Sequence, residues 1–170
     1  MQGIVIRKAT VQDLNDILDI YNQGIEDRIA TLETETKTLQ YMREWFENHG
    51  ERYVVLVAEL DGTVVGWASL NRYSSRSAYD GVADLSIYIE RASRGRGVGQ
   101  RLLQELEAEA IHYEFYKIVL FTFPFNGQGQ GLYRKSGYRE VGVFYKQGIL
   151  EGEFVDVMAM EKLLKSNKSI

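Results

Sequence analysis

The chain has 170 residues, of which 45% are hydrophobic and 26% are charged, and its formal net charge is -4. These values predict one globular domain with a sizeable core, and the acidic balance disfavours nucleic-acid binding, which usually needs a basic surface. The absence of cysteine excludes disulfides, thiolate metal sites and covalent catalysis by a cysteine. The N-terminus lacks an apolar h-region and no run approaches the roughly 20 apolar residues of a membrane span, so we expect a soluble cytoplasmic protein.

In chain order, the first half of the sequence shows strand and helix patterns. Residues 10–25 place apolar side chains at helical spacing behind Thr10, a residue type that caps helices well. The dipeptide Asp61-Gly62 separates two apolar runs and is the strongest hairpin signal in the chain. The elements expected here are a strand at 3–9, helices at 10–25 and 39–50, and strands at 52–60, 63–70 and 82–90.

The second half predicts a long helix, a buried strand, a short helix and a final hairpin. Pro124 is the only proline and cannot donate to a ladder, so it is expected to end the strand. No repeat or linker interrupts the pattern, which predicts one domain over 1–164 and a disordered tail at 165–170. About seven strands in a mixed α/β sheet, with four helices on its two faces, is the expected architecture. The expected elements are a helix at 99–113, a strand at 117–125, a helix at 131–137, and hairpin strands at 138–148 and 152–164.

The stretch "ERASRGRGVGQRLL", residues 90–103, lies between a predicted strand and a predicted helix. The first amides of a helix lack partners and its dipole favours an anion there. Three alternate glycines would let successive amides curl around phosphate oxygens, and four arginines add positive charge. We therefore expect phosphate binding, while a glycine-rich turn with solvated arginines remains the alternative. The residues concerned are Gly95, Gly97, Gly99, Arg91, Arg94, Arg96 and Arg101.

Two familiar phosphate loops do not fit this segment. The dinucleotide fingerprint needs a third glycine three positions after the second, where this chain has Gln100. The Walker pattern needs Gly-Lys followed by Ser or Thr, which the segment lacks.

The segment resembles the acyl-CoA loop of the GCN5-related N-acetyltransferases, whose pattern is matched by Arg94, Gly97 and Gly99. The strand "LSIYIE" before it and the later "NGQGQGLYRKSGY" also resemble that superfamily, in the right order and over nearly the whole chain. "RSAYDGVADLSIYI" and "KQGILEGEFVDVMAMEK" are similar to its phosphinothricin acetyltransferase branch, which includes relatives that act on arsinothricin and methionine sulfoximine or sulfone. The resemblance implies the superfamily fold, with splayed central strands, and a homodimer.

The resemblance also implies acetyl-CoA as cosubstrate and no metal. Backbone groups of the strand ending at Ile89 would bind pantetheine in the gap between the splayed strands, and the amides of 94–99 would bind the pyrophosphate. Asn126 would cap the following helix, bond pantetheine, or do both. The implied cofactor-binding residues are Ile87, Tyr88, Ile89, Arg94, Gly95, Arg96, Gly97, Val98, Gly99, Asn126 and Tyr133.

Two residues are candidates for catalysis on the same basis. Asp84 matches a Glu of the branch, and the shorter side chain predicts base action through a water or electrostatic placement of the ammonium. Tyr133 lies where the superfamily has its Tyr acid and the branch has His, and it is expected to stabilise the thiolate by a hydrogen bond. The alternatives are a strand-entry residue for Asp84 and an aromatic packed on the sheet for Tyr133.

The polar loop 71–81 is the candidate acceptor site. Arg76 aligns with the Arg of the branch's R-x-A-Y pattern, and a guanidinium can hold a phosphinate, arsonate or carboxylate with two parallel bonds. The alternative is a solvated arginine in a serine-rich loop. Glu33, in the loop after the first helix, is a candidate to hold the substrate ammonium, with a solvated face as the alternative. We assign no role to the two histidines, His49 and His112, which lack neighbouring ligand residues. The expected substrate-binding residues are Arg72, Tyr73, Arg76, Tyr79, Asp84 and Glu33.

The predicted function is direct transfer, in a ternary complex, of an acetyl group to the α-amine of a small glutamate-like amino acid, for detoxification or resistance. One alternative keeps the fold but acetylates a polyamine, an aminoglycoside or a protein N-terminus. The arginines of the acceptor loop disfavour a cationic amine, because like charges repel. The other alternative is a sensor that binds CoA without turnover, which the retention of Asp84 and Tyr133 disfavours.

Overall fold

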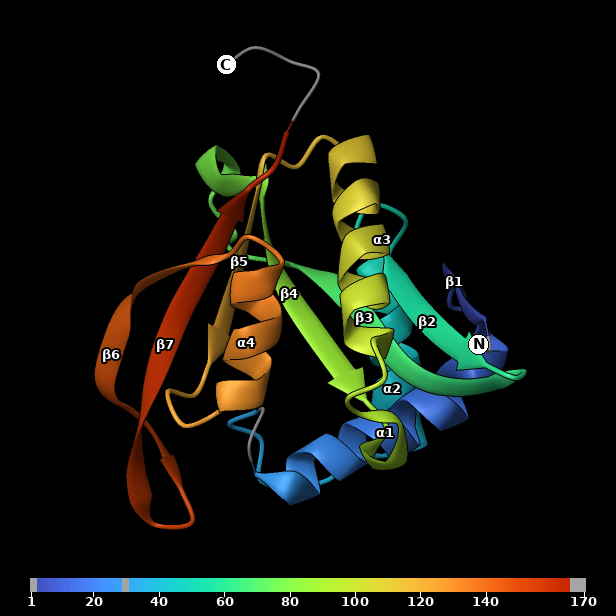
Figure 1. Ribbon diagram of the computed structural model, residues 1–170, viewed down its shortest axis with the longest axis horizontal. Helices are drawn as coiled ribbons and strands as arrows, with labels where there is room; N and C mark the ends of the chain where they lie inside the picture. Colours follow the sequence, from blue (N-terminus) through green and yellow to red (C-terminus); the bar gives the residue numbers. More distant parts are fainter. Residues whose placement is uncertain (1–2, 29–30, 166–170) are drawn as a thin grey trace.

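The computed structural model describes residues 3–28 and 31–165. Every expected strand and helix is present in it, and the expected tail lies almost wholly outside the described residues. Seven strands form one sheet in the order β1-β2-β3-β4-β5-β7-β6 (Figure 1). The strands are β1 Ile4–Lys8, β2 Val55–Leu60, β3 Thr63–Arg72, β4 Val82–Ile89, β5 Lys117–Thr122, β6 Arg139–Leu150 and β7 Glu153–Leu163. The helices are α1 Leu14–Asp27, α2 Leu39–His49, α3 Val98–His112 and α4 Gly127–Lys135.

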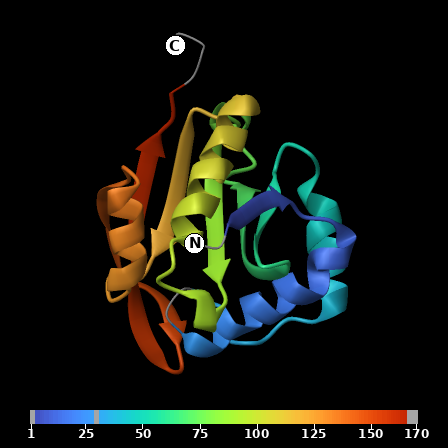
Figure 2. The same cartoon turned by 45° about the vertical axis from the view of Figure 1, so that its right-hand side comes forward.

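The sheet is mixed and carries helices on both faces. Its neighbouring strands are antiparallel except β4 and β5, which run parallel. Residues of β2 alternate between two cores, with Leu56 packed toward α3 and Val57 toward α1 and α2. Figures 1 and 2 show α3 and α4 side by side on one face. The two-residue period of β2 and β3 is what lets both helical layers bury apolar side chains on one sheet.

The two central parallel strands separate after a short paired stretch. β4 and β5 pair only from Val82 with Lys117 to Asp84 with Val119, although β4 continues to Ile89. On its other edge β4 stays paired with β3 as far as Ile89, so only the β5 side opens. Because a parallel strand beyond the last pair leaves backbone groups without ladder partners, this edge can receive an extended ligand. The splay starts at Asp84.

Most predicted boundaries are confirmed to within a few residues. Asp61 and Gly62 both have positive φ, 54° and 81°, as the tight turn between β2 and β3 requires. The last helix was predicted too short, since α4 begins at Gly127 rather than at 131. Thr10 caps a short 3-10 turn, Val11–Asp13, that precedes α1. Within the described ranges, no helix is long and apolar enough to cross a membrane.

Candidate active site

The loop between β4 and α3 has a backbone that only glycine adopts easily. Gly95 and Gly97 have φ of 79° and 83°, and a Cβ on either would meet no heavy atom within 4 Å. The backbone conformation, and not a lack of space, therefore selects glycine at both positions. Gly97 is the N-cap of α3, and no side chain caps this helix end. The first amides of α3 are consequently available to an anion.

Gly99 has a different role from the other two glycines. Its backbone is ordinary helix, but a Cβ there would lie 3.1 Å from Cδ2 of Leu132 on α4. Gly99 therefore allows α3 and α4 to approach closely beside the gap between β4 and β5.

The arginines of the loop are partly committed to other groups. Arg94 donates from Nε to the carbonyl oxygen of Ile89, at 3.1 Å, and pairs with Asp27 at 2.9 Å. Arg91 pairs with the same carboxylate at 2.7 Å, and these two guanidinium groups hold the pKa of Asp27 below its usual range. Arg94 thus fixes the loop against β4 and α1, while Arg96 and Arg101 point into solvent. The order of the charged residues along the sequence does not reveal this division.

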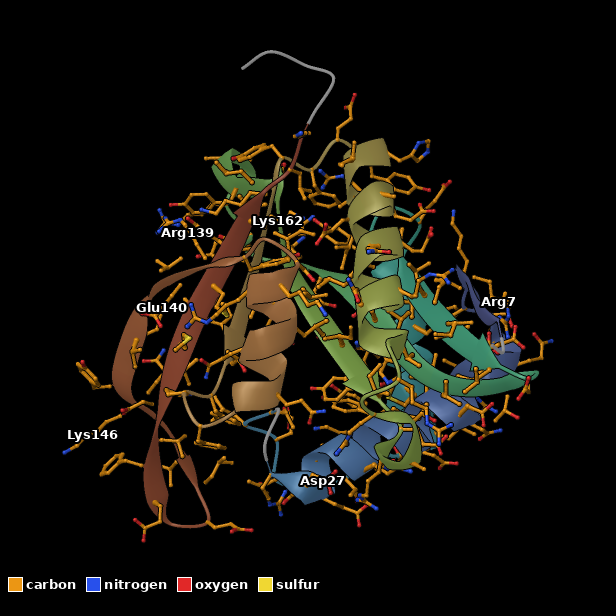
Figure 3. The ribbon with its side chains drawn as sticks, in the orientation of Figure 1. Arg7, Asp27, Arg139, Glu140, Lys146 and Lys162 are labelled. Atoms are coloured by element: carbon orange, nitrogen blue, oxygen red, sulfur yellow. The ribbon has the colours of Figure 1, made fainter. Side chains whose placement is uncertain are left out.

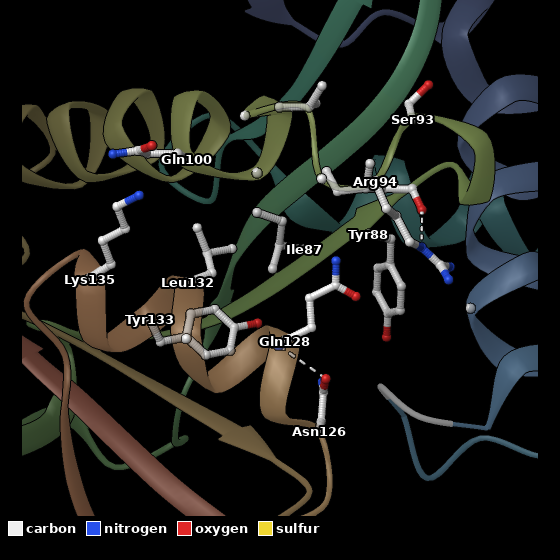
Figure 4. A pocket seen from close by; sticks show the side chains of 18 residues that line it. Ile87, Tyr88, Ser93, Arg94, Gln100, Asn126, Gln128, Leu132, Tyr133 and Lys135 are labelled. Atoms are coloured by element: carbon white, nitrogen blue, oxygen red, sulfur yellow. Dashed lines mark hydrogen bonds between the residues drawn. The ribbon is translucent and has the colours of Figure 1, made fainter.

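A cavity of about 370 Å³ lies between the loop, α3, α4 and the open edge of β4 (Figure 4). Ten of the eleven predicted cofactor-binding residues line it, and the exception is the exposed Arg96. The helical spacing of Gln128, Leu132 and Lys135 on α4 could have indicated that they share this face. Gly24 lies on α1, and nothing in the sequence around it indicates that it lines a ligand site. The lining residues that the sequence analysis did not predict are Gly24, Ser93, Gln100, Gln128, Gly129, Gly131, Leu132 and Lys135.

Asn126 lines this cavity and caps α4. Its Oδ1 accepts from the amide of Gly129 at 3.0 Å, and its Nδ2 donates to Oγ1 of Thr122 at 3.4 Å. A Cβ at Gly129 would lie 2.6 Å from Nδ2 of Asn126. A side chain at position 129 would therefore push against the Asn126 side chain that caps α4.

A second cavity of about 200 Å³ continues into the gap between β4 and β5. It shares Ile87, Tyr88, Asn126 and Tyr133 with the first cavity, so the two meet at these four side chains. Asp84 is the only acidic or basic residue among the described residues that line it. We call this second cavity the inner pocket.

The carboxyl group of Asp84 is perturbed by its surroundings. Burial raises its pKa to about 6, although a hydrogen bond from Nδ2 of Asn71, at 3.3 Å, and one from the backbone of Leu85 act in the opposite direction. A carboxylate with such a pKa is largely ionised at neutral pH yet basic enough to accept a proton.

Two tyrosines line both cavities at their junction. Burial raises the pKa of Tyr88 to about 12, and burial raises the pKa of Tyr133 well above its usual range. Both phenols therefore stay protonated at neutral pH and can act as hydrogen-bond donors. Figure 4 shows the hydroxyl of Tyr133 directed from α4 toward the middle of the site.

The predicted acceptor residues are less closely gathered. An outer hollow is lined by Asp84, Phe121 and the predicted Arg72, Tyr73 and Tyr79, but not by Arg76. Successive side chains of a strand point to opposite faces of the sheet, so Arg72 starts from the face opposite to that of Asn71. The guanidinium of Arg72 lies 5.9 Å from the ring centre of Tyr53.

Arg76 and Glu33 lie outside the three cavities described here. Arg76 is exposed at the start of the turn Ser77–Tyr79 and forms no ion pair with any described residue. Glu33 pairs with Lys37 at 2.9 Å, so its charge is already compensated. Across residues 3–28 and 31–165, no group of three or more His, Cys, Asp or Glu side chains could hold a metal ion.

Comparison with known proteins defines the class. Residues 14–138 match the model of the Acetyltransferase (GNAT) family. The chain is 35% identical over 162 residues to YwnH of Bacillus subtilis, a candidate phosphinothricin acetyltransferase, covering 95% of this chain and 99% of that one. It is 30% identical over 166 residues to the L-methionine sulfoximine/L-methionine sulfone acetyltransferase of Pseudomonas aeruginosa, covering 96% of each.

A solved structure gives the same class. The phosphinothricin acetyltransferase from Sinorhizobium meliloti, solved with acetyl-CoA, superposes with a TM-score of 0.90 at 26% identity, covering 96% of this chain and 90% of that one. The chain belongs to the GNAT acetyltransferase family and is an acetyl-CoA-dependent N-acyltransferase. Its free helix amides, its left-handed glycines and the open edge of β4 fit a pyrophosphate and an extended pantetheine.

Proposed function

We propose that this enzyme acetylates the α-amine of a small glutamate-like amino acid, such as phosphinothricin, whose tail is anionic, or methionine sulfoximine, whose tail is polar and uncharged. The observation that carries the proposal is the junction of the two cavities, with Asp84 on the acceptor side and Tyr133 at the junction itself. The inner pocket, at about 200 Å³, is smaller than a typical drug-sized site and suits a small acceptor. The names and similarity of the relatives support the same substrate class.

In this proposal Asp84 accepts the proton that the attacking amine must lose. An α-amine has a reference pKa of about 8, so transfer to a carboxyl group of pKa about 6 is uphill by roughly 2.7 kcal/mol. That cost is compatible with general base catalysis, directly or through one water. Acetyl-CoA supplies an acetyl group as a thioester, and the amine reaches it in one ternary complex because both cavities open at the same four side chains.

Tyr133 is proposed as a hydrogen-bond donor to the departing sulfur. Burial raises its pKa, so full proton transfer to a thiolate is less favourable than from a free phenol. Tyr133→Phe should therefore lower kcat about 10- to 100-fold with little change in the acetyl-CoA KM. Equal kcat values for the variant and the parent would contradict the proposed role of Tyr133.

For the anionic tail we propose Arg76, with the rings of Tyr73 and Tyr79 beside it. These rings lie edge to face at 5.9 Å, and Tyr79 belongs to the short turn that begins just after Arg76. Arg76 carries a charge that no described acidic residue compensates, unlike the loop arginines bound by Asp27. Such a guanidinium is available to a phosphinate or carboxylate.

A thiol-release assay with acetyl-CoA tests the proposal. The acceptors compared are phosphinothricin, arsinothricin, methionine sulfoximine, a polyamine, an aminoglycoside and a peptide with a free N-terminus. We expect turnover with one or more of the first three and a far lower kcat/KM with the others. Turnover confined to the last three would overturn the substrate class. A role in detoxification, a homodimer and a cytoplasmic location stay predictions.

A further inference from the structure

Asn71 on β3 links Asp84 to a histidine on another helix. Its Nδ2 donates to Oδ2 of Asp84 at 3.3 Å and to Oγ of Ser86 at 2.9 Å. Its Oδ1 accepts from Oγ of Ser69 at 2.9 Å and lies 2.9 Å from Nε2 of His49. Two donor and two acceptor sites are thus all used, which fixes the orientation of the amide.

His49, at the last residue of α2, faces two oxygen acceptors. Nδ1 lies 3.0 Å from the carbonyl oxygen of Trp45, and Nε2 faces Oδ1 of Asn71. An amide oxygen can only accept, so the contact with Asn71 is a hydrogen bond in which Nε2–H of His49 donates. The ring is also held 4.3 Å from the ring of Trp45.

We propose that Asn71 and His49 are positioning residues, which hold the Asp84 carboxylate toward the inner pocket and favour its ionised form. His49 donates to Asn71 and so strengthens the amide as a donor to Asp84, because linked hydrogen bonds polarise one another. This inference rests on the proposed role of Asp84 as base. It gives a task to a histidine that the sequence pattern left without one.

The His49 side of this hydrogen-bond network faces a hollow that shares no lining residue with the two cavities. His49 and Asn71 line this hollow of about 740 Å³ with Tyr41, Glu44 and Arg52 among the other residues around it. Among the described residues, the other titratable or charged side chains near Asp84 are Tyr88, Tyr133, Arg72, Tyr73 and Tyr79.

The direct test is a titration of Asp84 by NMR in protein labelled at the aspartate ¹³Cγ, with the resonance assigned from Asp84→Asn. Asn71→Ala should raise the midpoint by about one pH unit, since a hydrogen bond to the charged form is lost. His49→Leu should raise it by about half a unit, and His49→Gln, which keeps an N–H at a similar position, should restore most of it. The matched control is His112→Leu, which changes the exposed histidine at the end of α3.

A kinetic measurement separates positioning from folding. With phosphinothricin as acceptor, Asn71→Ala should lower kcat at pH 6 about fivefold and His49→Leu about twofold, and both should leave the acetyl-CoA KM unchanged. In an Asp84→Asn background neither substitution should lower kcat further. If His49→Leu lowers Tm but leaves the Asp84 midpoint unchanged, the histidine is only structural and the inference fails. If the midpoints move but Asp84→Asn has parental kinetics, the proposed base is wrong while the network stands.

Discussion

Asp27, at the C-terminal end of α1, holds the guanidinium of Arg94 at 2.9 Å and that of Arg91 at 2.7 Å. Figure 3 shows Asp27 at the end of α1 that faces the start of α3. One carboxylate from the first helix therefore fixes the loop that binds the pyrophosphate in our proposal. The loop arginines contribute to its shape as well as to its charge.

Asp27→Ala should raise the acetyl-CoA KM about tenfold, because the loop loses the carboxylate that binds Arg91 and Arg94 and holds it against α1. Initial rates at varied acetyl-CoA measure this effect. The control is Asp19→Ala, an exposed acidic residue of the same helix. An unchanged KM in Asp27→Ala would mean that the loop keeps its conformation without the ion pairs.

Gly97→Ala should also weaken acetyl-CoA binding, because a side chain at φ 83° costs about 1 to 2 kcal/mol. Isothermal titration with CoA should show a Kd about tenfold higher, provided the loop relaxes to relieve the strain. Gly142→Ala serves as the control, since Gly142 lacks a positive φ and has space for a Cβ. Equal affinities of the two variants would contradict the proposed role of the left-handed glycine.

Asp84→Asn should lower kcat about 10²- to 10⁴-fold and remove the acidic limb of the pH profile. The pKa of Asp84 is raised to about 6, so the base is ionised above that pH and the parent enzyme loses activity as the pH falls through it. Stopped or continuous thiol-release assays between about pH 5 and 8 would display the limb. A limb that persists in Asp84→Asn belongs to another group.

Arg76→Ala should raise the acceptor KM about 10- to 100-fold and leave the acetyl-CoA KM near its parental value. Arg72→Ala is the matched comparison, because Arg72 lines the outer hollow but its guanidinium lies 5.9 Å from the ring centre of Tyr53. We expect a much smaller change from it. A larger effect of Arg72→Ala would indicate that the anionic tail binds at the end of β3 and not beside the turn at 77–79.

Asp13→Asn should lower the free energy of unfolding by about 1 to 2 kcal/mol near neutral pH. Asp13 caps the start of the first helical segment through the amide of Thr10 at 2.7 Å and binds Arg7 through both oxygens at 2.8 Å. Arg7 holds the pKa of Asp13 below its usual range, so this stabilisation is present above the usual pKa and is lost as the pH falls through the folded-state value. Urea denaturation at several pH values would show the difference between variant and parent shrinking in acid.

The sequence by itself determined the elements with strong local signals. Asp61-Gly62 marked a turn because both residues must adopt positive φ, and the alternate glycines before α3 marked a phosphate loop for the same kind of reason. The period of two in the strands and of about 3.6 in the helices indicated which side chains are buried. The sequence also indicated Asp84 and Tyr133 as the catalytic candidates, but only through its resemblance to a known family.

The tertiary structure decided which distant residues meet. Asn71 reaches Asp84 because β3 and β4 pair in a register that places them opposite each other, and His49 reaches Asn71 because α2 packs on that face. Asp27 reaches Arg94 only through the packing of α1, and Gly99 owes its role to the approach of α4. Such contacts depend on sheet register and helix packing over long sequence separations, whereas local patterns report only the backbone and burial of their own segment.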